Sequence, residues 1–167
     1  ESPLTYGTRG YPRGIAAADV NADGHTDRVI ANWFSSDASV VLNKGDGSFW
    51  FNAVISLPTE PTAAGLYDLD ADGDPDLVTT PGEGHWSFRG IVVRKQQADG
   101  TYSAREIFDT GVNPVDLAGA DLDADGDIDL VIANSGSDDL SVLFNDGEGG
   151  FPEEQRFPVG VRPQYVS

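Results

Sequence analysis

The chain contains three copies of one sequence pattern. A nine-residue acidic segment occurs at residues 19–27, 68–76 and 121–129, where it reads DVNADGHTD, DLDADGDPD and DLDADGDID. The starts of these segments are separated by 49 and 53 residues. Self-similarity at a period of about 50 residues is typical of small structural units that bury their hydrophobic faces against one another. We therefore expect the chain to fold as a row of similar units.

Two further markers recur in the same order. A proline lies seven residues before each acidic segment, and a glycine-rich turn closed by an aromatic residue follows it. The last Asp lies 22 residues before the aromatic residue in repeats one and three, and 26 before it in repeat two. This difference predicts a four-residue insertion within 80–90. The prolines are Pro12, Pro61 and Pro114, and the aromatic residues are Phe49, Tyr102 and Phe151.

These markers divide one domain, residues 1–167, into repeats at about 12–60, 61–113 and 114–162. Residues 1–11 and 163–167 match the flanking strands of partial repeats. The chain begins with Glu1 and contains no Met, which is expected of a processed chain or of a segment of a longer protein.

Each repeat contains four candidate strands. The first is rich in Ala and Gly, and the later ones are rich in β-branched and aromatic residues. No stretch shows a sustained helical period. Four short antiparallel strands in each repeat predict an all-β fold of β-propeller blades, with a β-solenoid as the alternative. The expected strands are 14–18, 28–31, 39–42 and 49–55; 63–67, 77–79, 91–94 and 102–108; and 117–120, 130–133, 140–144 and 151–157.

The acidic segments predict metal sites. Carboxylates or an amide stand at positions 1, 3, 5 and 9, and a glycine at position 6 permits a sharp turn that faces the position 7 carbonyl inward. Crowded like charges repel unless a cation lies between them, and oxygen-only ligands favour Ca²⁺ over zinc or copper. We expect about three Ca²⁺ sites, one per repeat. Their positions are Asp19, Asn21, Asp23, His25 and Asp27; Asp68, Asp70, Asp72, Asp74 and Asp76; and Asp121, Asp123, Asp125, Asp127 and Asp129.

Two other interpretations of these loops compete with calcium sites of this kind. An EF-hand needs Glu at position 12 and flanking helices, but this sequence has Ile30, Thr79 and Ile132 there, between β-rich runs. Solvated Asx turns remain the structural alternative. Loop one carries Asn21 at position 3 and therefore has one ligand charge fewer, so we expect it to bind calcium most weakly.

Residues 113–151, which cover most of the third repeat, resemble the FG-GAP/VCBS repeat through their D-x-D-x-D-G-x-x-D element and the spacing around it. The resemblance implies the calcium-bearing β-propeller of integrin α-chains, bacterial surface proteins and fungal lectins. It also implies that structural metals lie between the first and second strands of each blade. The Phe-Gly and Gly-Ala-Pro signatures of the family survive only loosely, as Tyr6-Gly7 and 111–114. Family members often have enough repeats for seven blades, whereas this chain has three and a fraction.

Charge and composition exclude several partners. With 28 acidic and 10 basic residues the net charge is −18, which opposes binding to nucleic acid or anionic lipid. No run approaches 18 apolar residues, so no membrane insertion is expected. Calcium loops of extracellular modules bind at about 10⁻⁴–10⁻³ M, which favours an extracellular or cell-surface location. The absence of Cys excludes disulfides and thiolate ligands.

We expect a role in adhesion or assembly, not in catalysis, because three equivalent sites suit scaffolding and an enzyme needs one distinguished site. The partner would be a protein or further copies of the chain, joined through open blade ends. The alternatives are a carbohydrate-binding lectin and an accessory domain of a secreted polysaccharide-active enzyme. Candidate ligand residues are Trp33, His85 and Trp86 in the loops between second and third strands. Both Trp side chains could instead fill the space between blades.

Overall fold

A computed structural model describes residues 7–81 and 89–166 of the chain. These residues contain no helix, and thus none long and apolar enough to cross a membrane. Their strands form three four-stranded antiparallel sheets, which confirms the all-β prediction. The strands are β1 (Pro12–Ala16), β2 (Arg28–Asn32), β3 (Asp37–Asn43) and β4 (Phe49–Ser56); β5 (Pro61–Tyr67), β6 (Asp76–Pro81), β7 (Ile91–Arg94) and β8 (Glu106–Phe108); and β9 (Pro114–Ala120), β10 (Asp129–Asn134), β11 (Asp139–Phe144) and β12 (Glu153–Pro158).

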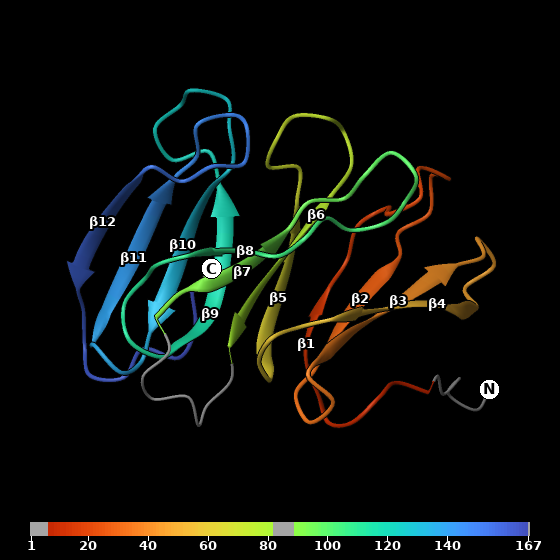
Figure 1. Cartoon of the computed structure of the whole chain (residues 1–167), viewed down its shortest axis with the longest axis horizontal. Helices are drawn as coiled ribbons and strands as arrows, with labels where there is room; N and C mark the ends of the chain where they lie inside the picture. The colour runs from red at the N-terminus through yellow and green to blue at the C-terminus, as the bar shows by residue number, and fades with distance from the viewer. Residues whose placement is uncertain (1–6, 82–88, 167) are drawn as a thin grey trace.

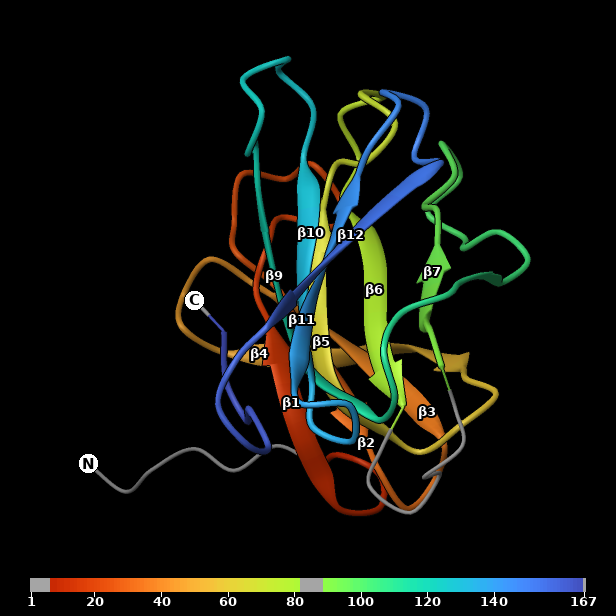
Figure 2. The same cartoon turned by 90° about the vertical axis from the view of Figure 1, so that its left-hand side faces the viewer.

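The three sheets stand side by side like neighbouring blades of a propeller (Figure 1). Within each sheet the strands lie in chain order, and the first strands β1, β5 and β9 contact one another from sheet to sheet. A view turned by 90° shows the same first strands clustered in the middle of the molecule (Figure 2). The acidic segments form the loops between the first and second strands, all at one end of the sheets.

Small residues line the contact between first strands. A Cβ on Gly14 of β1 would lie 2.9 Å from the Cα of Ala63 in β5, closer than side-chain packing allows. The Ala and Gly content of the first strands is therefore required by their close approach. Each first strand also begins with its repeat's proline, a position at which the missing N–H does not interrupt the sheet.

Strand register locates the insertion of repeat two. Arg28, the residue after the first acidic loop, pairs with Val41 in the first sheet. Leu77, its counterpart after the second acidic loop, pairs with Arg94 in the second sheet. The chain between the paired residues is four residues longer in the second sheet than in the first. In the third sheet the pair of Leu130 with Leu143 has the same separation as in the first. The four extra residues therefore lie between β6 and β7, as predicted.

The outer strand of the second sheet differs from expectation. The sequence predicts a strand over 102–108, but β8 covers only Glu106–Phe108, and Tyr102 forms an isolated bridge with Gln96. The physical reason is Ser103, whose hydroxyl accepts the Lys95 N–H at 3.0 Å where a backbone carbonyl would continue the ladder. The outer strand is thereby interrupted beside the glycine turn.

Two hydrophobic clusters join the sheets. Val29, Val40 and Ile55 of the first sheet pack with Leu77 of the second. Val78, Ile91 and Val93 of the second sheet pack with Leu117, Leu130 and Ile132 of the third. The core therefore lies between neighbouring sheets, as the repeat period requires.

The last described residues share one backbone feature with the starts of repeats one and three, but they form no strand. Tyr11 and Asn113, which precede the first-strand prolines of repeats one and three, have φ of 53° and 55°, and Arg162 before Pro163 has φ of 52°. Residues 163–166 form no strand, and the Val166 N–H donates to the Asp116 carboxylate at 3.0 Å.

Candidate metal centres

The aspartate at position 9 of each acidic loop is buried and connects its loop to the glycine turn that follows the third strand. Asp27, Asp76 and Asp129 are fully buried. One oxygen of each accepts the backbone N–H of position 2 in its own loop, at 3.1, 3.1 and 2.9 Å. The other accepts the N–H of the residue that begins the glycine turn after the third strand. These residues are Asn43, Gln96 and Asn145, at 2.7, 2.8 and 2.9 Å.

The sequence alone does not predict this double role, because it assigns position 9 only as a metal ligand. The signal that could have found it is an asparagine at the same distance after Asp27 and Asp129, where Asn43 and Asn145 begin their glycine turns. Because a carboxylate has further lone pairs, accepting two N–H groups leaves it able to contact a cation.

Within each loop, backbone N–H groups also donate to the carboxylates at positions 1 and 5. The position 1 carboxylate accepts the N–H of the position 6 glycine in every loop, at 2.7, 3.1 and 3.2 Å. The position 5 carboxylate accepts the N–H of position 7, at 2.8, 2.9 and 2.9 Å. The glycines adopt φ of 86°, 93° and 103°, as their predicted role requires. The preceding turn also holds Ala22, Ala71 and Ala124 at φ of 57°, 56° and 66°, a left-handed conformation that the alanines themselves do not signal in the sequence.

Two loops gather three carboxylates each. In loop two, ligand oxygens of Asp68, Asp70 and Asp72 all lie within 4.8 Å of one another, and in loop three Asp121, Asp123 and Asp129 do so. Asp70 Oδ1 is buried and has no hydrogen-bond partner within the described residues. An oxygen-only set with an unsatisfied buried oxygen fits a hard divalent cation.

Loop one is less complete in the described structure, where it gathers no such carboxylate group. Asn21 at position 3 uses its amide to donate to Asp23 Oδ2 at 3.0 Å. This amide contact is in keeping with the expectation that loop one binds most weakly, which remains a prediction.

In loops one and three the position 7 side chains lie against the glycine turns. A Cβ on Gly45 would lie 2.4 Å from His25 Nε2, and one on Gly147 would lie 2.7 Å from Asp127 Oδ2. At this position the backbone carbonyl, and not the side chain, is therefore the group best suited to face a cation.

Burial raises the pKa of two acids of loop two, Asp70 and Asp76. Burial raises the pKa of Asp76 to about 6, although N–H donation from Gln96 and Leu69 opposes the shift. Burial and then the neighbouring Asp72 raise the pKa of Asp70. A bound divalent cation would favour the ionised forms and lower both pKa values.

Side-chain amides join the second and third glycine turns to the acidic loop of the preceding repeat. Gln96 donates to the Val20 carbonyl and Asn145 donates to the Leu69 carbonyl, both at 2.9 Å. Position 2 of loops one and two is accordingly buried, at 7% and 1% exposure, whereas Leu122 of loop three is 47% exposed. Two of the three loops are thus built into the contacts between repeats.

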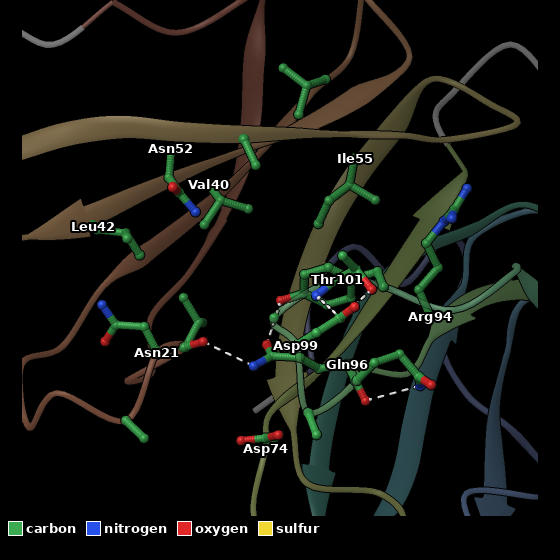
Figure 3. Close-up of a pocket in the computed structure, with 18 of the residues that line it drawn as sticks. Asn21, Val40, Leu42, Asn52, Ile55, Asp74, Arg94, Gln96, Asp99 and Thr101 are labelled. Carbon is green, nitrogen blue, oxygen red and sulfur yellow. Dashed lines mark hydrogen bonds between the residues drawn. The ribbon is translucent and has the colours of Figure 1, made fainter.

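A cavity of about 650 Å³ lies between the first and second sheets (Figure 3). Val40, Leu42 and Ile55 form its apolar side, and Asn21, Asp74 and Asp99 contribute polar groups. Arg94 is fixed at its edge by donating to the carbonyls of Ser56 and Ser103, at 2.7 and 3.0 Å. The mixed lining suits a small polar ligand with an apolar face.

Trp33, the predicted ligand residue that lies within the described part of the chain, does not line this cavity. Trp33 packs against Tyr11 in the turn after β2, with ring centroids 6.5 Å apart, and the Arg13 guanidinium lies 5.7 Å from the Trp33 centroid. Phe34 lies 6.3 Å from Tyr11, and these two rings are 70% and 71% exposed. His85 and Trp86 lie outside the described residues. Tyr11 and Phe34 were missed because single exposed aromatic residues carry no sequence pattern.

Comparison with known proteins supports the repeat and the fold. A family model described as an FG-GAP-like repeat matches residues 19–79 and 68–132. No curated protein matches the chain. Among solved structures, Pseudomonas aeruginosa periplasmic gluconolactonase, PpgL, is similar with a TM-score of 0.61 and 22% sequence identity. The alignment covers 89% of this chain and 40% of the gluconolactonase chain, so this chain spans less than half of that protein's length. At this identity the likeness concerns the fold alone.

Proposed function

This chain belongs to the FG-GAP-like repeat family, and on that basis we propose that it is a calcium-binding β-propeller module of an extracellular or cell-surface protein. Its role is adhesion or protein assembly, not catalysis. The observation that carries this proposal is the buried position 9 aspartate, which links each acidic loop to a glycine turn. A cation in the loop would therefore stiffen the whole end of its sheet.

The proposed ligands are the carboxylates at positions 1, 3, 5 and 9, with Asn21 at position 3 of loop one and the carbonyl at position 7. Calcium supplies charge neutralisation and fixed geometry when bound. Equivalent loops in three repeats favour a structural metal, since each loop plays the same part in its own sheet. Binding in the range of extracellular modules, about 10⁻⁴–10⁻³ M, would fill these loops where free calcium is millimolar.

An open apolar face supports a role in assembly. Leu122, Phe157 and Val159 on the third sheet are 47%, 47% and 40% exposed. The residues at the same positions of the first sheet, Val20, Ile55 and Leu57, are buried beneath the second sheet. The third sheet thus presents the kind of surface that joins repeats within the chain, and we propose that a protein partner or another copy of the chain covers it.

Light scattering tests this proposal. We expect a mass above that of the 17.7 kDa monomer in millimolar Ca²⁺ and a smaller mass after chelation. Phe157→Ser should reduce association, whereas Ile107→Ser on β8, where the side chain is equally 47% exposed, should not. A monomer under both conditions would rule out self-assembly and leave a separate protein as the partner.

A lectin function is the second candidate, supported by the cluster of Tyr11, Trp33 and Phe34. The third repeat builds the same turn without aromatic residues, since Ser135 donates its N–H to the Asn113 carbonyl at 3.0 Å, as Trp33 does to Tyr11 at 2.9 Å. The fold therefore does not require the aromatic rings. Exposed ring faces suit carbohydrate, whether in a free lectin or in an accessory domain of a secreted polysaccharide-active enzyme.

Fluorescence distinguishes this function from assembly. With Ca²⁺ held constant, a neutral oligosaccharide should shift the tryptophan emission in the wild-type chain. Phe34→Gly, which installs the residue found at position 136 of the third repeat, should weaken that response about tenfold through loss of one stacking ring. An unchanged response in Phe34→Gly would place any sugar site elsewhere, and no response in the wild type would remove the lectin function.

A further inference from the structure

Lys95 brings a positive charge to acidic loop two. It directly follows β7, and its ammonium lies 3.8 Å from Asp70 Oδ2. The same ammonium donates a hydrogen bond to the Glu148 carbonyl in the glycine turn of the third repeat. One side chain therefore connects a candidate calcium loop to the neighbouring repeat.

The surroundings of Lys95 are shaped to hold it. The side chains of Lys95 and Asp70 are only 21% and 22% exposed. Gly149, with φ of 73°, leaves the space that the lysine occupies, because a Cβ there would lie 2.9 Å from Nζ. The ammonium is thus seated between loop and turn and does not extend freely into solvent.

The other two repeats lack this cation. In repeat two, Lys95 directly precedes Gln96, the residue that begins the glycine turn. The corresponding residue is Leu42 in repeat one and Phe144 in repeat three. At the contact of the first two repeats, Leu42 lines the open cavity, and nothing lies within 4 Å of a Cβ built on Gly100, the counterpart of Gly149. Repeats therefore pack without a lysine at this position, so Lys95 is not a general requirement of the fold.

We propose that Lys95 is a resident counter-ion that weakens calcium binding in loop two and holds the loop in shape when calcium is absent. This inference rests on the proposed calcium binding. Asp70 stands at ligand position 3, so an incoming Ca²⁺ meets a positive charge already paired with one of its ligands. Loop two then binds more weakly than its four ligand aspartates suggest, and loop three, which has no such partner among the described residues, binds most tightly.

The test follows each loop separately by NMR. The amides of Gly24, Gly73 and Gly126, at position 6 of the three loops, report calcium binding site by site during a Ca²⁺ titration. In Lys95→Met we expect the Gly73 transition to move to about tenfold lower Ca²⁺, the effect of removing a unit positive charge about 6 Å from a divalent cation in a largely aqueous medium. The Gly24 and Gly126 transitions should stay within about twofold, and higher salt should shrink the change.

Matched variants separate this role from general effects. Lys44→Met removes the same charge from the glycine turn of repeat one, and within the described residues Lys44 forms no ion pair with an acidic loop. It should leave the Gly73 transition unchanged. Lys95→Arg should retain wild-type affinity, because it preserves the charge. Lys95→Gln gives the same test as Lys95→Met if the apolar side chain impairs folding.

The outcomes also distinguish a failure of this inference from a failure of the proposed calcium binding on which it rests. Saturable Ca²⁺ binding at the three glycines with no selective change at Gly73 in either neutral variant would overturn the role of Lys95 alone. Equal shifts at all three glycines would likewise overturn it, since they indicate only a change in net charge. The absence of any saturable transition in the wild-type chain would instead overturn calcium binding itself.

Discussion

Chelation of calcium is expected to lower the midpoint of thermal unfolding by about 10 °C. If each of three sites has a dissociation constant of about 5 × 10⁻⁴ M, about 5 mM Ca²⁺ stabilises the folded state by about 1.4 kcal/mol per site and about 4 kcal/mol in all. For a chain of 167 residues, about 1 kcal/mol moves the midpoint by about 2–4 °C. Differential scanning calorimetry in Ca²⁺ and in chelator measures the shift.

Magnesium provides the control for this prediction. Mg²⁺ carries the same charge but requires octahedral geometry and retains its water, so it should recover only a small part of the lost stability. Equal midpoints in calcium and in chelator would contradict the proposal that these loops are calcium sites. Equal stabilisation by both ions would indicate diffuse screening of the −18 net charge and no specific coordination.

The fold was largely predictable because its determinants are local and repeated. Prolines at fixed spacing begin the first strands, small residues mark the strands that approach one another, and the acidic segments mark the intervening loops. Even the insertion in repeat two could be placed, since the distance between two recurring markers of the repeat grows there by four residues. The register of Leu77 with Arg94 confirms that placement.

The candidate sites were less predictable because their decisive contacts join distant residues. The Asp129 carboxylate accepts the backbone N–H of Asn145. The Asn145 side-chain amide in turn donates to the Leu69 carbonyl of the preceding repeat, 76 residues away. No pattern within one repeat reveals that second contact. Lys95 is similar, because its ammonium lies beside Asp70 of its own repeat and also donates to the Glu148 carbonyl of the next repeat, 53 residues away. The sequence thus predicts which residues could act as metal ligands, whereas it does not predict the contacts that join one loop to another.

The position 9 aspartate should matter to stability even without metal. In chelator, Asp129→Asn is expected to reduce the free energy of unfolding by about 3 kcal/mol, because one buried N–H would face an amide group that cannot accept it. The wild-type carboxylate accepts the N–H groups of Leu122 and Asn145, both at 2.9 Å. Urea unfolding of the metal-free chain measures the loss.

Asp123→Asn is the matched control, because it removes the same charge from the same loop at an exposed position. Its carboxylate accepts the N–H of Asp125 within the loop, at 3.2 Å, and no hydrogen bond joins it to another element of the described structure. In chelator its loss should stay within about 0.5 kcal/mol, as for most surface substitutions. In millimolar Ca²⁺ both variants should lose stability, since both remove a proposed ligand. Similar losses for the two variants in chelator would mean that the two hydrogen bonds to the buried Asp129 carboxylate contribute nothing to stability beyond the effect of its charge. The loops would then depend on calcium alone to hold the ends of the sheets together.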